Sequence, residues 1–471
     1  MHRHLAADLA RLPELLEATR ARATDFLAGL TGRPVVPPWR APEPEPLPEQ
    51  GAGLHGALAE FAERWEPLMS ASAGPRYLGF VTGGVTPAAL AGDWLTATMD
   101  QNPTSALDQA GQQLERLTIA WLREMFGLSP AHDGAFVSGA TTSNTVGLAI
   151  AREWLGDRLG VHVAADGVGA LGGRVRVLSG TPHSSIGKGL AVLGLGRRAL
   201  TEVPTLADRE AVDPAALEEA LKAAAREAAG PCVVAANAGT VNTADFDDLL
   251  AIIELRDRYG FWLHIDAAFG GFAALSPAHA HLVAALDAAD SICVDLHKWL
   301  NVPYDSALQF TRHAALQARV FQNSAAYLGP LGDEPDLIHL TPENSRRLRA
   351  LAAWFTLRAY GRAGHAAIVE ECVAGARALG RAIADIDALR LLAPVRLNVV
   401  CFTLADDPAP ERLADLAADL TDDVFVSPTV YAGVPALRAA FTNWRTTQDD
   451  CRRIAEALSR HVPRYASTEI S

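Results

Sequence analysis

Between residues 114 and 296 the chain alternates short apolar runs with longer amphipathic segments. The apolar runs, which are typical of buried strands, cover residues 135–139, 174–180, 232–239, 261–268 and 291–296. The spacing of apolar residues predicts helices over 114–128, 141–155, 184–195, 214–230 and 246–260. Strands that alternate with helices of about 10–15 residues indicate βαβ units and a mostly parallel sheet. We therefore expect an α/β fold whose ligands bind at the carboxyl ends of the strands.

Two flanking regions depart from this alternation. Residues 2–30 carry leucines at helical spacing, residues 31–53 are rich in proline, and residues 54–69 are again helix-like. Such an arm cannot bury its apolar face alone, so we expect it to pack on a larger body or a partner subunit. A long helical stretch from Glu343 to about Ala384 is followed by a mixture of strands and helices. We predict an N-terminal helical and proline-rich arm (1–85), a large domain (86–342) and a small α+β domain (343–471).

Composition excludes several classes of function. The 471 residues carry a net charge of −14, which argues against a nucleic-acid-binding surface. The five cysteines are scattered without a CxxC pair, so we expect buried small hydrophobes in a reducing compartment and no metal site. The N-terminus lacks the apolar stretch of a secretory signal, and no apolar run is long enough to span a membrane. We expect a soluble, cytoplasmic protein.

Polar residues with reactive side chains stand where the expected strands end. Asp266 closes the run FWLHID, Lys298 follows SICVDL, and His183 lies three residues after RVRVLSG. The segment SGATTSN (138–144) joins another expected strand to a helix. Because parallel strands end at the same edge of a sheet, we expect these four positions to converge.

The four positions suit one cofactor. Free N–H groups and hydroxyls at a helix start bind a phosphate. A desolvated lysine amine can form a Schiff base with an aldehyde. A buried aspartate can keep a pyridine nitrogen protonated, and a histidine can stack on the ring. Phosphate, aldehyde and pyridine together make up pyridoxal 5′-phosphate (PLP).

Each residue also has a plainer interpretation when it is taken alone. Lys298 could be a surface lysine, Asp266 a helix cap, and His183 a structural histidine. Arg438 and Arg445 could bind a carboxylate, but a solvated surface arginine is the better interpretation of both. The joint pattern therefore carries more weight than any single residue.

Ordered motifs connect this pattern to a known family. TPHSSIGKGL (181–190), HIDAAFGG (264–271) and LHKWLNVPYDSA (296–307) resemble the group II PLP-dependent decarboxylases, which include the aromatic amino-acid and glutamate decarboxylases. SGATTSN resembles the phosphate-binding turn of that family, and the likeness covers most of the chain from about Pro75. It implies PLP-dependent fold type I, with a large seven-stranded sheet domain, a small C-terminal domain and a homodimer whose N-terminal segments embrace the partner.

The resemblance also implies a role for individual residues. Lys298 would form the Schiff base, Asp266 would pair with the pyridine nitrogen, and His183 would stack on the ring near the substrate carboxylate. Four positions would bind the cofactor alongside them: Ala268 under the ring, and Ala140, Thr141 and His297 at the phosphate. The implied reaction is decarboxylation of an L-amino acid to its amine through a quinonoid, with no metal, nucleic acid or membrane involved.

One feature departs from the family. Its decarboxylases carry a loop tyrosine that returns a proton to the substrate, and residues 329–345 contain none. His339 is the nearest proton donor by position, while Tyr327 resembles a different, structural tyrosine. A decarboxylating aldehyde synthase is therefore the alternative activity, with a transaminase or a non-catalytic relative as lesser alternatives.

The substrate is weakly constrained by the sequence. Residues 76–84 and 102–111 resemble substrate-pocket segments, and the second lacks the aromatic residue of aromatic-specific relatives. This favours a small or polar side chain over an indole or a catechol.

Overall fold

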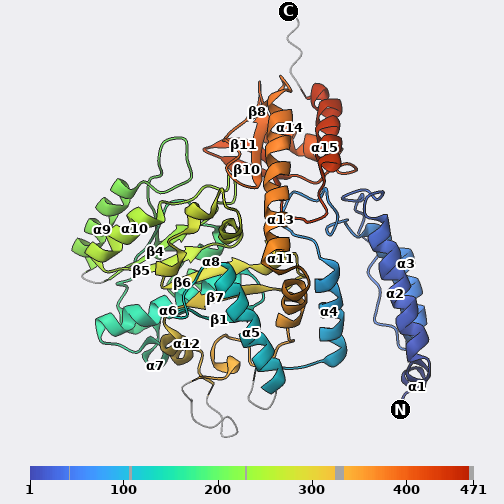
Figure 1. Cartoon of the computed structure of the whole chain (residues 1–471), viewed down its shortest axis with the longest axis horizontal. Helices are drawn as coiled ribbons and strands as arrows, with labels where there is room; N and C mark the ends of the chain where they lie inside the picture. The colour runs from blue at the N-terminus through green and yellow to red at the C-terminus, as the bar shows by residue number, and fades with distance from the viewer. Residues whose placement is uncertain (42, 105–108, 229–230, 324–333, 466–471) are drawn as a thin grey trace, which may run out of the picture.

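A computed structural model of the chain describes residues 1–41, 43–104, 109–228, 231–323 and 334–465. Its larger part is built on a seven-stranded sheet (Figure 1). In spatial order the strands are β1 (Asp133–Val137), β7 (Ala307–Thr311), β6 (Ser291–Asp295), β5 (Trp262–Asp266), β4 (Val233–Asn237), β2 (Val177–Ser179) and β3 (Leu200–Glu202). β7 is antiparallel to both of its neighbours, and the other adjacent pairs are parallel. The expected α/β fold with a mostly parallel sheet is confirmed.

The sheet is buried on both faces, which explains why its strands read as continuous apolar runs. Along β4, Val234 and Ala236 belong to the larger hydrophobic core, while Val233 and Ala235 belong to a second core on the other face. Successive side chains of a strand point to opposite faces, so one short run feeds both cores. Helix α6 (Ala140–Leu159) packs against β5, β6 and β7.

The other helices follow in chain order. They are α1 (Arg3–Ala10), α2 (Leu12–Gly29), α3 (Gly53–Arg64), α4 (Pro87–Met99), α5 (Gln109–Met125), α7 (Val163–Asp166), α8 (Ser184–Val192), α9 (Pro214–Ala228), α10 (Leu249–Tyr259), α11 (Leu296–Trp299), α12 (Ala314–Phe321), α13 (Ala350–Ala384), α14 (Pro410–Asp419) and α15 (Gln448–His461). Among the described residues, no helix is long and apolar enough to cross a membrane.

A second, antiparallel sheet lies beside α13 and α14. Its spatial order is β10 (Ser427–Tyr431), β11 (Val434–Ala440), β9 (Val399–Leu404) and β8 (Leu389–Leu391). The segment before α4 lies against it, because Leu78 donates from its backbone N to Phe425 O (2.9 Å) and accepts from Ala440 N (2.8 Å). An early segment of the chain is therefore held by the last sheet.

The predicted long helix from residue 343 was wrong in two respects. α13 begins only at Ala350, and Gly361 (φ 60°, ψ −173°) interrupts it. The residues before it serve side-chain ion pairs instead, since Arg346 pairs with Glu115 at 2.5 Å. A positive φ is a conformation that glycine adopts without strain, so the break falls where the sequence permits one.

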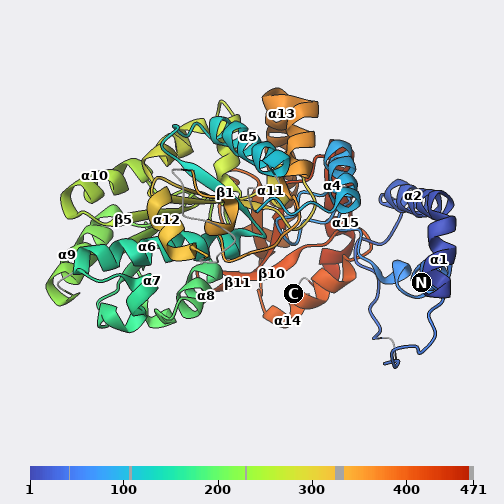
Figure 2. The same ribbon diagram turned by 90° about the horizontal axis from the view of Figure 1, so that it is seen from below.

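The N-terminal helices stand to one side of the body in both views (Figures 1 and 2). Leu5, Leu9, Leu12 and Leu16, which the sequence places at helical spacing, are all exposed. All five cysteines, including Cys232, Cys293 and Cys401, are free and buried as expected.

Candidate active site

The carboxyl ends of the central strands border a cavity of about 280 Å³. Lys298, Asp266, His183, Ala268, His297 and Ala140 all line it, so the structure brings together six of the seven residues singled out in the sequence. Thr141 follows Ala140 in the first turn of α6 but is not one of the lining residues. The remaining lining residues are Phe80, Val81, Thr181, Asn237, Gly239, Thr240, Val241, Phe269, Tyr304 and Arg438.

Lys298 lies in α11, the single turn that follows β6. Its Nζ is 2.8 Å from Asp295 Oδ2, and its side chain is only 17% exposed. Burial acts to lower the pKa of Lys298, but the ion pair and hydrogen bond with Asp295 and the charge of Asp266 outweigh it and raise the pKa. The amine is therefore a cation paired with Asp295.

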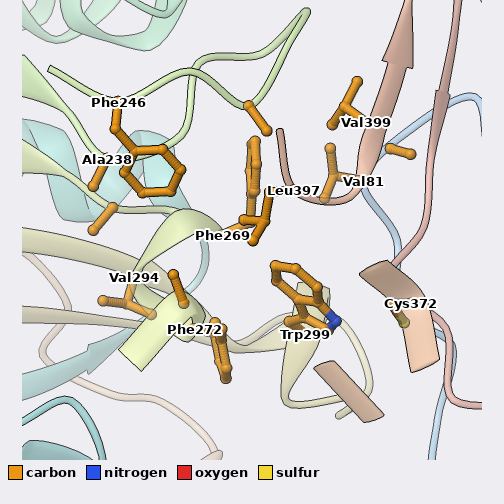
Figure 3. Close-up of a cluster of buried hydrophobic side chains, with 14 of the residues drawn as sticks. Val81, Ala238, Phe246, Phe269, Phe272, Val294, Trp299, Cys372, Leu397 and Val399 are labelled. Carbon is orange, nitrogen blue, oxygen red and sulfur yellow. The ribbon is translucent and has the colours of Figure 1, made fainter. Parts of the chain in front are cut away.

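The turn that carries Lys298 is fixed from two sides. Trp299 is fully buried, and its ring centroid lies 6.3 Å from that of Phe272; Figure 3 shows Trp299 between Phe272 and Cys372. On the other side Gly83 donates from its backbone N to His297 O at 3.1 Å. A Cβ at Gly83 would stand 1.6 Å from the Lys298 carbonyl oxygen, so only glycine allows this contact.

Asp295 links Lys298 to the start of α6. Its Oδ1 accepts a 2.6 Å hydrogen bond from Ala140 N, and the residue is 2% exposed. His297 Nδ1 is 3.0 Å from the Ser306 carbonyl and donates to it, which leaves Nε2 3.6 Å from Asp295 Oδ2. Burial lowers the pKa of His297 and so favours this neutral form.

Asp266, at the end of β5, is held by two donors. Its Oδ1 accepts from Ala268 N (3.1 Å) and its Oδ2 from Asn144 Nδ2 (2.8 Å). Asn144 Nδ2 also donates to Ser185 Oγ (2.9 Å), and Asn144 Oδ1 lies 2.9 Å from His264 Nε2. Burial lowers the pKa of His264, so its ring is neutral and donates from Nε2 to Asn144. A fully buried network thus supports the Asp266 carboxylate from behind.

His183 is the N-cap residue of α8 and shares this network. Its Nδ1 lies 2.7 Å from Ser185 Oγ and accepts from Ser185 N at 3.3 Å. Because Nδ1 is an acceptor, the proton of the neutral ring resides on Nε2. Burial is the main cause that lowers the pKa of His183, although the charge of Asp266 opposes it. The neutral imidazole can therefore donate one hydrogen bond to a ligand.

Aromatic side chains form one wall of the cavity. The Tyr304 ring lies 4.2 Å from that of His297, centroid to centroid, and its hydroxyl is 2.9 Å from Thr82 Oγ1. Phe80 and Tyr304 are both more than half exposed, so they mark the side of the cavity that faces solvent. Tyr304 lies inside a quoted motif but received no role from the sequence.

The interpretation of Arg438 as a solvated surface residue was wrong. Arg438 is 8% exposed, lines the cavity, and donates to Val241 O (3.0 Å) and Gly79 O (2.9 Å). Strand β11 of the small sheet carries Arg438 to the cavity, which its local sequence does not reveal. Arg445 is half-buried and its guanidinium lies over the Trp444 ring at 4.6 Å.

The residues expected around the missing loop tyrosine are only partly described. Tyr327 and residues 329–333 lie outside the described residues, as do residues 105–108 of the second substrate segment. His339 is buried, accepts from Asn323 N at 3.1 Å, and is not among the residues that line the cavity. In the first substrate segment, Phe80 and Val81 do line it.

This set of groups fits PLP. A helix N-terminus favours a phosphate, a carboxylate held by neutral donors can face a pyridine nitrogen, and a lysine amine can meet an aldehyde. Phe269 and Ala268 give the cavity apolar surface beside these groups, as a flat ring requires.

Comparisons with known proteins agree with this fit. The family profile described as "Pyridoxal-dependent decarboxylase conserved domain" matches residues 41–405. The chain is 29% identical to the L-2,4-diaminobutyrate decarboxylase of Rhizobium meliloti (strain 1021), over 88% of this chain and 83% of that protein. It is 26% identical to the aromatic-L-amino-acid decarboxylase of Bacillus atrophaeus, over 82% of each protein. The crystal structure of Oryza sativa TDC with PLP and tryptamine shares the fold, with a TM-score of 0.89, 24% identity, and coverage of 97% and 99% of the two chains.

Proposed function

This chain belongs to the pyridoxal-dependent decarboxylase family, and on that premise we propose that it removes the carboxyl group of an L-amino acid as carbon dioxide and releases the amine. It is a carboxy-lyase whose cofactor is PLP. One observation carries the proposal: Lys298, Asp266, His183 and the first residue of α6 all border the same cavity.

The chain's own residues have distinct tasks in holding the cofactor. PLP supplies an aldehyde that takes up the amino acid and a pyridinium ring that accepts the electron pair left when carbon dioxide departs. Lys298 provides the attaching amine, and Asp266 keeps the ring nitrogen protonated with the support of Asn144. The first turn of α6, with Ala140 and Thr141, would hold the phosphate, and Ala268 would offer apolar surface to the ring.

The substrate carboxylate needs donors and a dry surface. His183 carries its proton on Nε2 and is the donor for one carboxylate oxygen. Arg438 adds a buried positive charge to the same cavity and favours an anionic group there. Val81 and Phe269 are buried apolar neighbours that exclude water, which strengthens these polar contacts.

Tyr304 is the residue we assign to proton return. Among the cavity-lining residues that the structure describes, it is the only tyrosine, and Thr82 holds its hydroxyl at 2.9 Å. The Tyr304 hydroxyl holds the proton that the substrate α-carbon receives after carbon dioxide leaves. This role replaces the family's loop tyrosine and favours the amine over the aldehyde as product.

The charges around the cavity favour a substrate with an uncharged side chain. Within the described lining, Asp266 is the only carboxylate, and the proposed contact with the ring nitrogen occupies it. A cationic substrate side chain would lie near the positive charges of Lys298 and Arg438. No free carboxylate of the described lining would neutralise it.

We assign the homodimer to the N-terminal arm. Leu5, Leu9, Leu12 and Leu16 expose their side chains on α1 and α2, which stand off from the body in two views. An exposed apolar row of this kind is stabilised by burial against another chain. A second copy of the protein is the partner we propose.

The decisive assay incubates the purified, PLP-loaded protein with each L-amino acid and scores carbon dioxide, amine, aldehyde, ammonia and peroxide. Carbon dioxide and amine should form in equal amounts from an amino acid whose side chain is uncharged. Lys298→Ala should lose both turnover and the visible absorbance of attached cofactor. Leu250→Ala, a change at an exposed helix position outside the cavity, serves as the control and should retain both.

Other outcomes would contradict the proposal in specific ways. Aldehyde, ammonia and peroxide as main products would indicate an aldehyde synthase, and accumulation of pyridoxamine phosphate would indicate a transaminase. A Lys298→Ala variant that kept full turnover would remove the central residue from the mechanism.

A further inference from the structure

Asp295 occupies the place where an anion is expected to bind. Its carboxylate accepts from Ala140 N at 2.6 Å, at the start of the 20-residue helix α6. A helix N-terminus attracts negative charge through its free N–H groups and its dipole. In the structure this attraction is satisfied by the Asp295 side chain.

The same carboxylate also neutralises Lys298. Asp295 Oδ2 lies 2.8 Å from Lys298 Nζ, so one buried group engages both the phosphate end and the attaching amine of the site. Arg438 is the other fixed cation of the described lining, and it is hydrogen-bonded to Val241 O and Gly79 O. An arriving phosphate must therefore compete with Asp295 for the α6 terminus or bind beside its charge.

Space is open beside Gly139 at the α6 terminus. A Cβ at Gly139 would lie 3.7 Å from His297 Cε1 and 4.0 Å from Asp295 Oδ1, so the glycine leaves this approach free of side-chain atoms. Asp295 itself is 2% exposed and its backbone N donates to Ala268 O at 2.8 Å. The backbone at Asp295 is fixed, and only its side chain can yield to a phosphate.

We propose that Asp295 is a resident anion that competes with the cofactor's phosphate and thereby sets the affinity of the site for PLP. The inference rests on the proposed function, since it takes the first turn of α6 as the phosphate site. Two unit charges about 4 Å apart near a protein surface interact by several kcal/mol, and Lys298 offsets part of this repulsion. Removal of the charge should therefore strengthen phosphate binding about tenfold.

The test compares Asp295→Asn with the wild-type protein by calorimetric titration of three probes. PLP carries both aldehyde and phosphate, pyridoxal carries only the aldehyde, and inorganic phosphate carries only the anion. Asp157→Asn is the matched control, because it removes one carboxylate from the opposite end of α6, where Asp157 pairs with Arg319. Asp295→Ser, which keeps an acceptor oxygen without the charge, replaces Asp295→Asn if that variant does not fold.

The dissociation constants of PLP and inorganic phosphate should fall about tenfold in Asp295→Asn. That of pyridoxal should change less than about threefold, and Asp157→Asn should behave as wild type. An equal gain for all three probes would show that Asp295 acts only through Lys298, and weaker binding of PLP and phosphate would show that it supports the cofactor. Either result would overturn the inference. Absence of PLP binding by the wild-type protein would instead contradict the proposed function itself.

Discussion

Replacement of Asn144 by alanine tests whether the buried network controls the cofactor site. The change removes the amide that donates to Asp266 (2.8 Å) and Ser185 (2.9 Å) and accepts from His264 (2.9 Å). A hydrogen bond to a charged group is worth about 1.5–3 kcal/mol, and a buried donor left without a partner costs about 1–3 kcal/mol. We expect the free energy of unfolding to fall by about 3–5 kcal/mol.

The effect on PLP follows from the bond to Asp266. If the Asp266 carboxylate loses a hydrogen bond worth about 1.5–3 kcal/mol and PLP binding weakens by the same free energy, the dissociation constant of PLP should rise about 10- to 150-fold. Titration of the cofactor-free protein, followed by the absorbance of bound PLP, measures this shift, and urea unfolding measures stability.

A matched variant separates the two effects. Asn398 is equally buried in the small sheet, where its Nδ2 donates to Phe441 O at 2.9 Å. Asn398→Ala should lower stability and leave PLP affinity within about twofold of wild type. A PLP affinity unchanged in Asn144→Ala, or reduced equally in both variants, would refute the role of the network.

Three further outcomes are expected. Burial lowers the pKa of His365 to about 4, below the ordinary value of about 6.5 that applies to the unfolded chain, so the unfolded state gains protons first as the pH falls. The free energy of unfolding should therefore drop by about 3 kcal/mol between pH 6.5 and 4. In urea unfolding at a series of pH values, His365→Leu should remove this pH dependence. The control His281→Leu, at an exposed position, should leave the pH profile parallel to that of the wild-type protein. Tyr304→Phe should slow amine release and raise the share of aldehyde in the product assay, and an unchanged product ratio would exclude the proton role. Glu115→Gln leaves buried Arg346 without its counter-charge and should cost about 3–5 kcal/mol in urea unfolding; a cost under about 1 kcal/mol would show that the pair contributes little.

The sequence predicts the sheet well because the signal is local. Each run of apolar residues overlaps the strand that it forms, and the fully buried strands need no alternation with polar residues. The reactive residues at the strand ends can be predicted for the same reason, since Asp266 closes one such run and Lys298 lies two residues after another. β7 and β3 escape prediction: β7 is a short antiparallel strand that closely follows the VPYD segment, and β3 is only three residues long.

The residues that support the site through hydrogen bonds could not be predicted from the sequence, because their hydrogen-bond partners are remote in the chain. Asn144 lies within the quoted SGATTSN, but it received no role of its own from the sequence. Its partners Ser185 and Asp266 are 41 and 122 residues away. The burial of Arg438 could not be predicted for a related reason, because it depends on how the small sheet packs against the large one. Only the folded structure shows which polar residues are buried away from solvent.

The register of the sheet explains how two carboxylates share one site without the same task. Asp266 of β5 pairs with Cys293 of β6, so Asp295 lies two residues further along the neighbouring strand. Two residues preserve the side-chain face, and both carboxylates therefore meet α6: Asp266 through Asn144 and Asp295 through Ala140. They are offset by about 7 Å along the strand direction, at about 3.3 Å per residue. A slip of one residue would turn Asp295 to the opposite face, so the pairing of β5 with β6 fixes one acid near the proposed ring site and the other at the proposed phosphate site.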